Sequence, residues 1–275
     1  MNLDELLNEV LNISRAAGDE ILKVYNDASG IDVETKSDSS PVTQADLKAN
    51  ALIVERLEAL DPKYPVLTEE SNMADFEIRK NWSRYWIVDP LDGTKEFINR
   101  NGEFTVNIAL IENHQPILGV VYVPVQDTAY LGLVGEKAEK ISGDQREVIA
   151  CRKLKSVLPV VEIVASKNHL NADTEQFIAA VQSAYGEIDS KSIGSSLKFC
   201  LLAEGSADVY PRFAPTSEWD TAAAQAVLQA AGGQVYKQDL TPLDYNAKEN
   251  ILNPYFFAVA DTSVDWKTVL QQTSV

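Results

Sequence analysis

Four stretches of the sequence place carboxylates beside apolar or turn residues, where an unpaired charge is costly to bury. In YWIVDPLDGTKEF, residues 85–97, a hydrophobic run ends in two aspartates that enclose a proline and a leucine. The other three stretches are PVTQADLKAN, YPVLTEES and SEWDTAAAQ. Together the four stretches supply the candidate acids Asp46, Glu69, Glu70, Asp89, Asp92 and Asp220.

The acids outside the 85–97 stretch also have ordinary structural explanations. Asp46 fits a solvated helix position, and Asp220 fits an N-cap for the helix that follows it. The pair of glutamates in YPVLTEES fits a charged turn. Asp89 and Asp92 are harder to explain in this way, since a carboxylate at the end of a buried strand needs a hydrogen-bond donor or a metal.

The turn that contains these two aspartates favours a metal. Pro90 fixes the backbone, and Gly93 lets the chain approach a ligand closely. Two carboxylates side by side suit Mg²⁺, a hard cation that takes oxygen ligands and keeps waters for chemistry. The carbonyl oxygen of Leu91 is a further candidate ligand. We therefore expect magnesium at this turn.

The remaining residue types narrow the chemistry. Histidine occurs only at His114 and His169, neither in a catalytic motif, so a histidine nucleophile or metal cage has little support. Phosphoryl transfer most needs carboxylates and a hard metal, because metals neutralise charge on the phosphate oxygens during in-line displacement. Thr94 is placed to orient a water molecule that Glu69 would deprotonate. The helix after Asp220 would point free N–H groups at an anion.

Two other motifs fit less well. Phosphatases of the haloacid dehalogenase type follow an apolar strand with D-x-D-x-T, whose first aspartate is a nucleophile, and WIVDPLDGT resembles that motif. The spacing here is D-x-x-D, which places the two acids on opposite faces of an extended chain. We therefore prefer a metal-activated water to an aspartyl-phosphate. An EF-hand fits still less, because DPLDGTKEFINR lacks the alternating acids before its glycine.

The elements that must position these acids are helices and an antiparallel sheet in the first half of the chain. Apolar residues recur at helical spacing in residues 1–25, and TQADLKANALIVERLEAL has the pattern of a second amphipathic helix. A YWIV strand is followed by the β-rich runs EFTVNIALIEN and QPILGVVYVPVQDTAYLGLVG. We predict an antiparallel meander flanked by helices.

From about residue 160 onward, strands and helices alternate, as in an α/β unit. The expected strands are VEIVAS, SKSIG and ADVYPRF, and the expected helices are TEQFIAAVQSAYG, SSLKFCLLAEG and TAAAQAVLQAAGG, before closing strands and a terminal helix. This change predicts an N-terminal α+β lobe over residues 1–150, with the metal motifs, and a C-terminal α/β lobe over 151–275, with the last aspartate. SGDQREVIACRKLKS has the composition of a linker between them.

Composition limits the partners and the compartment. A formal charge of −17 opposes non-specific binding to nucleic acid or an anionic membrane, because a cationic surface normally drives such binding. An anionic ligand must therefore meet local cations or a metal. Cys151 and Cys200 form no CxxC pattern, and no run is long and apolar enough to span a bilayer. The acidic N-terminal segment is unlike a signal peptide, so we expect a cytoplasmic protein.

Taken as an ordered set, the motifs resemble the inositol monophosphatase superfamily of lithium-sensitive, magnesium-dependent phosphatases. SPVTQAD, TEES, WIVDPLDGTKEFI, GVVYVPV, IGSSLKFCLLAEGSADVYPRF and EWDTAAAQAVLQAAGG follow one another in the family's order over nearly the whole chain. The resemblance implies an α+β fold, the layered αβαβα sandwich of the inositol monophosphatase and fructose-1,6-bisphosphatase type. It also implies inhibition by lithium.

The resemblance assigns the acids to separate ions. Glu69, Asp89 and the Leu91 carbonyl would hold one Mg²⁺. Asp89, Asp92 and Asp220 would hold a second. The residue types and their spacing point to the same carboxylates but do not divide them between ions.

Other positions also match the family. Glu69 and Thr94 would activate the attacking water, and Asp46 matches an aspartate near a third, weaker metal position. These three are the expected catalytic residues, with two or three Mg²⁺ in the active site. Glu70 matches an acid beyond the direct ligands. The backbone N–H groups of Gly93 and Thr94 would bind phosphate.

Two departures from the inositol monophosphatase pattern bear on the substrate. This chain has DGTKEFI where those enzymes usually have DGTTNF, and Phe213 where they carry a glutamate for the sugar ring. Phe213 either packs near a base or fills the core. DGTKEFINRNGEFTVNIALIENHQPILGVVYVPV and YPRFAPTSEWDTAAAQAVL instead resemble bacterial 3'(2'),5'-bisphosphate nucleotidases of the CysQ type. These hydrolyse adenosine 3',5'-bisphosphate to AMP and phosphate, which clears a by-product of sulfate assimilation.

A bisphosphate substrate has a second phosphate that the reaction leaves intact. Arg212 is the first candidate to bind it, because a guanidinium contacts phosphate at two points, and Lys198 is the next. Ser195 and Ser196 precede an expected helix and are candidate donors, although serine at such a position is commonly a cap. The expected substrate contacts are Glu69, Leu91, Asp92, Gly93, Thr94, Ser195, Ser196, Lys198, Arg212 and Asp220. Lys36, in VETKSD, and Lys95, beside the metal turn, are secondary candidates.

Alternatives remain open at this point. An inositol or sugar phosphatase, including one with fructose-1,6-bisphosphatase-like activity, would use the same metal site. A catalytically silent binding regulator belongs to a different class, and nothing in the sequence favours it. The expected partner is a small nucleotide bisphosphate rather than nucleic acid or an integral membrane segment, and the nucleotidase branch favours a monomer. Peripheral association with the cytoplasmic face of the inner membrane occurs in relatives but has no visible basis in this chain.

Overall fold

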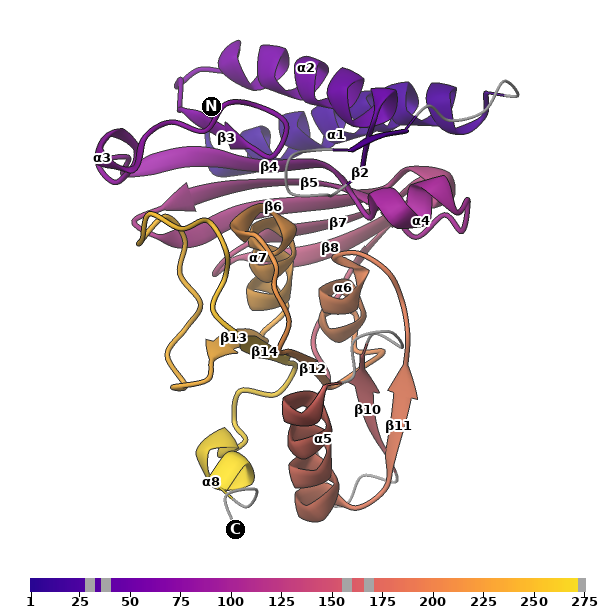
Figure 1. Ribbon diagram of the computed structural model, residues 1–275, viewed down its shortest axis with the longest axis vertical. Helices are drawn as coiled ribbons and strands as arrows, with labels where there is room; N and C mark the ends of the chain where they lie inside the picture. The colour runs from indigo at the N-terminus through magenta and orange to yellow at the C-terminus, as the bar shows by residue number, and fades with distance from the viewer. Residues whose placement is uncertain (28–32, 36–40, 155–159, 166–170, 272–275) are drawn as a thin grey trace.

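The computed structural model describes residues 1–27, 33–35, 41–154, 160–165 and 171–271. In Figure 1 the helices and sheets lie in layers along the long axis, with the N-terminal helices at one end and the C-terminus at the other. The layered αβαβα expectation is confirmed. Among the described residues, no helix is both long and apolar enough to cross a bilayer.

The larger sheet has seven strands in the order β3-β4-β5-β6-β7-β8-β9. Strands β3 and β4 are parallel, and every later neighbouring pair is antiparallel, as the predicted meander requires. The strands are β3 (Val66–Thr68), β4 (Arg84–Asp92), β5 (Thr105–Glu112), β6 (Gln115–Val123), β7 (Thr128–Leu133), β8 (Lys137–Ser142) and β9 (Gln145–Val148).

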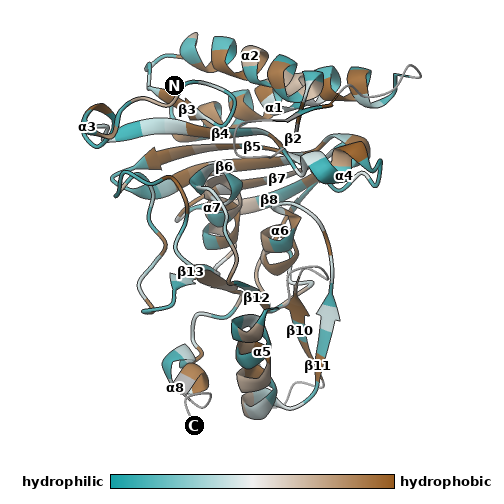
Figure 2. Cartoon of the chain, in the orientation of Figure 1, coloured by the Kyte–Doolittle hydropathy of each residue, from teal (hydrophilic) through white to brown (hydrophobic). Residues whose placement is uncertain are grey.

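Strand β4 is apolar on both faces because both faces of its sheet are covered. Trp86 and Val88 belong to the hydrophobic cluster under α1 (Leu3–Tyr25) and α2 (Gln44–Glu58). Tyr85 and Ile87 belong to the cluster on the opposite face. Figure 2 shows the central strands of this sheet in brown, with teal on the outer surfaces of the helices. Alternate side chains therefore enter two different cores, and the run of apolar residues is continuous.

The smaller sheet has five strands in the order β11-β10-β12-β14-β13. Strand β10 is parallel to β11 and β12, whereas β14 is antiparallel to β12 and β13. The strands are β10 (Val161–Val164), β11 (Ile188–Lys191), β12 (Val209–Arg212), β13 (Gln234–Lys237) and β14 (Phe256–Val259).

The predicted bounds of β11 were wrong at both ends. SKSIG was expected as a strand over residues 190–194, but β11 spans Ile188–Lys191. After Lys191 the chain leaves the small sheet, because the amides of Gly194 and Ser196 bond to carboxylates beside the large sheet. These residues form a wall of the site described below.

Helices fill the space between the sheets and cover their outer faces (Figure 1). Helices α6 (Leu197–Ala203) and α7 (Ala222–Ala230) lie between the two sheets, and α5 (Ala172–Tyr185) and α8 (Trp266–Gln271) pack on the far side of the small sheet. The remaining elements are β1 (Val33–Thr35), β2 (Pro41–Thr43), α3 (Phe76–Arg79), α4 (Thr94–Ile98), η1 (Pro124–Gln126) and η2 (Glu218–Asp220).

The division into lobes near residues 145–160 stays a prediction. The hydrophobic cluster around α6 and α7 takes side chains from both sides of that boundary, including Ile87 and Val121 before it and Phe199 and Val227 after it. Helix α7 follows the predicted boundary in the sequence, yet it packs directly on β6 and β7. Asp220, which lies just before α7 in the sequence, is thereby brought to the large sheet.

Candidate active site

The first component of the site is the end of β4. The pairing register with β5 shifts between Asp89 and Asp92, where Pro90 lacks the N–H that a regular ladder needs. Asp89 is 1% exposed, and its Oδ1 accepts a hydrogen bond of 3.0 Å from the Leu91 amide. The predicted turn is therefore an irregularity inside a strand, and it keeps two carboxylates at one end of the sheet.

Asp92 connects the large sheet to the segment before α6. Its Oδ2 accepts a 2.6 Å hydrogen bond from the Ser196 amide and a 3.4 Å hydrogen bond from Asn107 Nδ2. Asn107 lies opposite Asp89 in β5. Residues more than a hundred positions apart in the chain thus meet at one carboxylate.

Thr94 and Asp46 also lie within hydrogen-bonding distance of each other. Thr94 Oγ1 donates to Asp46 Oδ1 at 3.3 Å and lies 3.5 Å from the Leu91 carbonyl oxygen. The other carboxylate oxygen of Asp46 accepts bonds from the Thr43 amide and hydroxyl, at 2.8 and 2.6 Å, in the capping box of α2. Asp46 is therefore both a helix-capping residue and a neighbour of the predicted water-orienting threonine.

Glu69 follows β3, at the same end of the sheet. Its amide donates a 3.3 Å hydrogen bond to the Val88 carbonyl, one residue before Asp89. Glu69 and Glu70 are both half-buried. The negative charge of Glu69 contributes to raising the pKa of Asp89 and Asp220, so the three carboxylates share one electrostatic environment.

Asp220 reaches this environment from η2. Its Oδ2 accepts a 2.9 Å hydrogen bond from the Ser217 amide, which closes a capping box around the short helix. Burial, followed by the charge of Asp92, raises the pKa of Asp220 to about 8. The sequence expectation that Asp220 caps a helix is therefore compatible with a role in the acidic cluster.

A buried polar network lies behind η2. Glu218 is 1% exposed, and its Oε2 accepts a 2.7 Å hydrogen bond from the Asn246 amide. The side chain of Asn246 in turn bonds to Arg79, which also donates to the Glu249 carbonyl. Arg79 lies at the end of α3, beside the large sheet. The network ties the turn that carries Asp220 to the N-terminal half of the chain.

Burial and mutual repulsion raise the pKa values of three of these acids. Burial raises the pKa of Asp89 well above its ordinary value, and the charges of Glu69, Asp92 and Asp220 raise it further. Burial also raises the pKa of Asp92 to about 6, against the opposing charge of Lys198. A divalent cation would relieve this repulsion, and carboxylate and carbonyl oxygens are the donors that Mg²⁺ takes. The donor set therefore fits magnesium.

The acids are near neighbours without forming a ready-made cage. Within the described ranges, no three His, Cys, Asp or Glu side chains lie close enough together to hold an ion as they stand.

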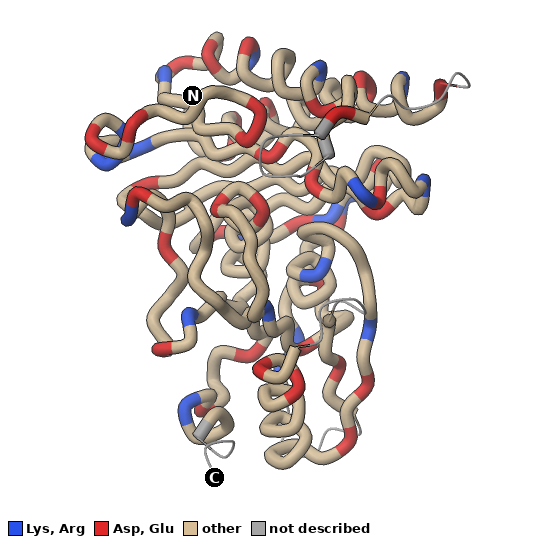
Figure 3. Tube along the Cα trace, viewed as in Figure 1, with Lys and Arg blue, Asp and Glu red and all other residues tan. Residues whose placement is uncertain are grey.

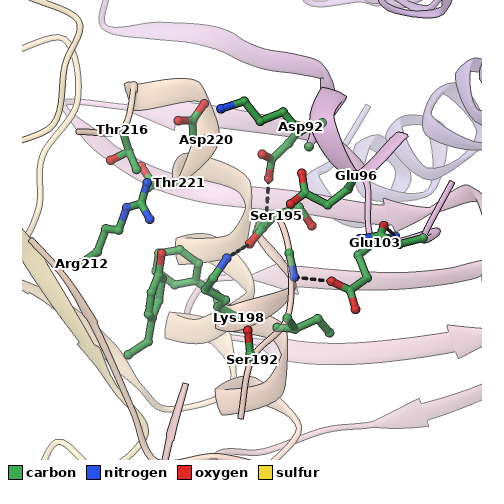
Figure 4. Close-up of a pocket in the computed structure, with 18 residues that line it drawn as sticks. Asp92, Glu96, Glu103, Ser192, Ser195, Lys198, Arg212, Thr216, Asp220 and Thr221 are labelled. Atoms are coloured by element: carbon green, nitrogen blue, oxygen red, sulfur yellow. Dashed lines mark hydrogen bonds between the residues drawn. The ribbon is translucent and has the colours of Figure 1, made fainter. Parts of the chain in front are cut away.

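A cavity of about 390 Å³ opens beside these acids (Figure 4). Its wall combines the end of β4 and α4 with the segment before α6, the end of β12 and the end of η2. Among the sequence-predicted residues, those that line it are Asp92, Gly93, Lys95, Ser195, Ser196, Lys198, Arg212 and Asp220.

Three cations of the described chain line this cavity, Lys95, Lys198 and Arg212, and Lys198 and Arg212 lie deeper than Lys95. Figure 3 shows acidic residues spread over the whole trace. Lys198 is 6% exposed, donates a 3.0 Å hydrogen bond to the Ser195 carbonyl and lies 5.7 Å from the centre of the Tyr210 ring. Burial lowers the pKa of Lys198 to about 8. Arg212 donates to the Pro215 carbonyl at 3.1 Å, while its buried Nε has no hydrogen-bond partner in the part of the chain that the structure describes.

The two predicted serines differ in their surroundings. Ser196 is buried, and its hydroxyl lies 2.9 Å from both Asn107 Oδ1 and Thr105 Oγ1. Ser195 has a φ of 49° and a buried hydroxyl that has no hydrogen-bond partner among the described residues. Only the hydroxyl of Ser195 is thus uncommitted to another protein group.

Other predicted positions lie away from the acids. Phe213 is 6% exposed and packs against Phe177 and Tyr255, with ring centres 5.6 and 6.3 Å apart, so it fills the core. Lys95 is exposed at the rim of the cavity. Lys36 lies outside the described residues.

Several residues of the site were not singled out from the sequence. Asn107 bridges Asp92 and Ser196, and Glu103 accepts a 2.7 Å hydrogen bond from the Gly194 amide. A weak signal for Asn107 exists in TVNIALIE, where an amide interrupts a run of buried strand residues. Glu103 gives no such signal, because an acid in the loop before a strand is ordinary.

Comparisons with known proteins agree on one family. The model of the family described as "Inositol monophosphatase family" matches residues 2–264. The 3'(2'),5'-bisphosphate nucleotidase CysQ of Escherichia coli K12 is 47% identical over 251 residues, which cover 91% of this chain and 98% of the relative. The protein of the same name from Haemophilus influenzae is 36% identical over 269 residues, 98% of this chain and 97% of the relative.

Solved structures give the same result. The crystal structure of CysQ from Bacteroides thetaiotaomicron, described as a bacterial member of the inositol monophosphatase family, has a TM-score of 0.81 at 43% identity. The match covers 93% of this chain and 97% of that one. An inositol monophosphatase from Zymomonas mobilis has a TM-score of 0.76 at 21% identity, over the full length of both chains, and supports the fold alone.

Proposed function

This chain belongs to the inositol monophosphatase family, and from that premise we propose that it is a Mg²⁺-dependent 3'(2'),5'-bisphosphate nucleotidase. Its substrate would be adenosine 3',5'-bisphosphate, which it converts to AMP and phosphate, with a role in sulfate assimilation. The observation that carries the proposal is one cavity with the half-buried carboxylates of Asp92 and Asp220 on one side and Lys198 and Arg212 on the other. An enzyme for a monophosphate needs only the first of these two sides.

The metal ligands in this proposal are the Leu91 carbonyl and the carboxylates of Glu69, Asp89, Asp92 and Asp220. Magnesium, when bound, would neutralise charge on the phosphoryl oxygens and lower the pKa of a water molecule. The mutual repulsion that raises the pKa values of Asp89, Asp92 and Asp220 supports this assignment.

The chain's own residues would orient and deprotonate the attacking water. Glu69 accepts the proton, and the Thr94 hydroxyl, which Asp46 and the Leu91 carbonyl hold, fixes the direction of attack. The backbone N–H groups of Gly93 and Thr94 donate to the reacting phosphate. Gly93 has a φ of 95°, and a Cβ there would lie 3.2 Å from the Glu103 carbonyl oxygen. Both observations favour a glycine at this position, and a residue without a side chain leaves its N–H open to the phosphate.

The cationic side of the cavity would bind the phosphate that remains on the product. Arg212 offers an unpaired Nε, and Ser195 an unpaired hydroxyl, both buried in the cavity wall. Lys198 adds a positive charge that burial keeps from solvent. A ligand with two phosphates can satisfy both sides at once, and this supports the nucleotide over a sugar monophosphate.

The direct test is phosphate release from adenosine 3',5'-bisphosphate and from inositol 1-phosphate, each with Mg²⁺ and with EDTA. Fast, EDTA-sensitive turnover of the nucleotide and slow turnover of the inositol ester are expected. A preference for the inositol ester would be consistent with the proposed metal site but would contradict the proposed substrate. If neither ester nor fructose 1,6-bisphosphate were hydrolysed, while Mg²⁺ and the nucleotide still bound, the protein would be a silent binding protein.

The pH dependence of substrate capture is expected to report Lys198. Because its pKa is about 8, Lys198 is cationic below that pH and neutral above it, with the charge of Asp92 opposing the change and that of Arg212 favouring it. We expect kcat/KM for the bisphosphate to fall by up to roughly tenfold per unit above pH 8. Lys198→Arg should shift this alkaline limb upward, because arginine stays charged. If kcat/KM fell at the same pH in the wild type and in Lys198→Arg, the titration of Lys198 would not be the cause of the fall.

Lithium is expected to inhibit the enzyme at millimolar concentrations, since the site gathers several carboxylates around a hard cation and the family is lithium-sensitive. The measurement is the initial rate with LiCl at fixed Mg²⁺, beside matched NaCl and KCl to separate ionic strength from a specific ion effect. Equal rates in the three salts would contradict the prediction.

A further inference from the structure

The segment 192–196 joins the small sheet to α6, yet it is anchored from the large-sheet side. The Gly194 amide donates a 2.7 Å hydrogen bond to Glu103 Oε2, and the Ser196 amide donates a 2.6 Å hydrogen bond to Asp92 Oδ2. In Figure 4 one dashed line ends at the Asp92 carboxylate and another at the Glu103 carboxylate. The residue between the two anchored amides is Ser195.

The contact at Gly194 is close on all sides. A Cβ added there would lie 2.8 Å from Glu96 Cγ, 3.0 Å from the Glu103 carbonyl oxygen and 3.1 Å from Glu103 Cβ. Only a glycine lets the segment approach the loop that carries Glu103 this closely. The hydrogen bond and the packing therefore act on the same backbone unit.

Ser195 sits in a conformation that needs such anchoring. Its φ of 49° lies in the left-handed region, which costs a residue with a Cβ free energy unless its surroundings hold it. Its hydroxyl is buried without a partner, and its carbonyl accepts the hydrogen bond from Lys198. This strained residue thus presents an unused hydroxyl donor to the cavity, and its carbonyl orients Lys198.

We propose that Glu103 is a positioning residue for the second phosphate: by holding the Gly194 amide, it fixes Ser195 and Lys198 for the phosphate that does not react. This inference rests on the proposed function, because only a bisphosphate occupies that part of the cavity. Glu103 itself touches neither phosphate.

The position of Glu103 and its charge have opposite effects on an anionic ligand. Its hydrogen bond orders the phosphate-binding segment, whereas its negative charge faces a cavity that must accept phosphate. Glu103→Ala removes both the acceptor and the charge. Glu103→Gln keeps an acceptor oxygen of the same reach and removes only the charge. Glu96→Gln removes a neighbouring charge from the same wall without removing any hydrogen bond among the described residues, so it is the charge control.

The test compares adenosine 3',5'-bisphosphate with adenosine 3'-monophosphate, which lacks the second phosphate. For Glu103→Ala we expect KM for the bisphosphate to rise about tenfold, the scale of one hydrogen bond to a charged acceptor. We expect kcat, and KM for the monophosphate, to stay within about twofold of wild type. Glu103→Gln and Glu96→Gln should both have a KM for the bisphosphate no higher than wild type.

Amide hydrogen exchange of residues 192–196 separates the possible failures. Faster exchange in Glu103→Ala than in Glu103→Gln is expected. Exchange in Glu103→Ala that equals the wild-type exchange would overturn the positioning role. So would a rise in KM that is equal for the bisphosphate and the monophosphate. Equal impairment of the glutamine and alanine variants would also overturn it, since the acceptor would then not matter. A wild-type protein that treats the two substrates alike would instead overturn the proposed function.

Discussion

Replacing Asp89 with asparagine is expected to lower the rate of phosphate release by about a thousandfold, the scale of lost electrostatic stabilisation in a transition state. Asp89 is the one carboxylate proposed to contact both magnesium ions. The substitution keeps the shape of the side chain, and an amide oxygen can still accept the bond from the Leu91 amide. The loss would therefore reflect charge rather than packing.

The same substitution is expected to raise the thermal stability of the metal-free protein. The pKa of Asp89 is raised by burial and by the charges of Glu69, Asp92 and Asp220, so its ionised form opposes folding near neutral pH. A neutral asparagine removes that cost. Magnesium should then stabilise the variant less than the wild type, since part of its binding energy is lost.

The measurement pairs initial rates with melting temperatures, each with Mg²⁺ and with EDTA. Asp144→Asn, at an exposed position between β8 and β9, is the matched control and should change neither quantity. An Asp89→Asn protein with more than a tenth of the wild-type rate would contradict the metal assignment. So would an unchanged stabilisation by Mg²⁺.

The largest effect on stability is expected from Gly119→Ala, a change of one methyl group. A Cβ on Gly119 would lie 2.3 Å from the Ala223 carbonyl oxygen and 2.7 Å from Ala226 Cβ. At Gly132, in the next strand, it would lie 2.5 Å from Val227 Cα. The backbone of α7 therefore rests directly on β6 and β7, and backbone cannot rotate away as a side chain can.

We expect Gly119→Ala to lower the free energy of unfolding by about 3 kcal/mol, the upper part of the range for overpacked cores. Because α7 begins just after Asp220, the displaced helix should also weaken activation by Mg²⁺. Urea unfolding gives the first quantity and the Mg²⁺ dependence of the rate gives the second. Gly135→Ala is the control: nothing lies within 4 Å of its added Cβ, and its φ of +83° costs only about 1 kcal/mol. Equal stabilities of Gly119→Ala and wild type would mean that α7 does not rest on the strand.

The local pattern of the chain predicted most of the elements. The helical spacing in residues 1–25 and the apolar runs of the meander correspond to α1 and to β4–β7, because both faces of that sheet are covered by apolar layers. Two stretches differ from the prediction. SGDQREVIACRKLKS was expected as a linker, but it contains β9, which pairs with β8. SKSIG failed for a non-local reason: its Gly194 amide bonds to Glu103, and the Ser196 amide just after it bonds to Asp92, so the chain leaves the small sheet after Lys191.

The sequence by itself determined the chemical types at the site: a buried strand that ends in DPLD, glutamates after a second strand, and an aspartate before a small-residue helix. Apolar runs and acidic residues can be seen directly in the sequence, so the sequence alone predicts which acids follow buried strands. The family resemblance then implied which ion each acid would hold.

Only the tertiary structure decided which groups are free to act. It left the hydroxyl of Ser195 unpaired while committing that of Ser196 to Asn107, and it packed Phe213 into the core. It also placed Glu103, an unremarkable loop acid in the sequence, against Gly194. These outcomes depend on contacts between distant segments, 89 residues apart for Asn107 and Ser196 and 91 for Glu103 and Gly194. Such contacts arise only when the two sheets and the helices between them pack together.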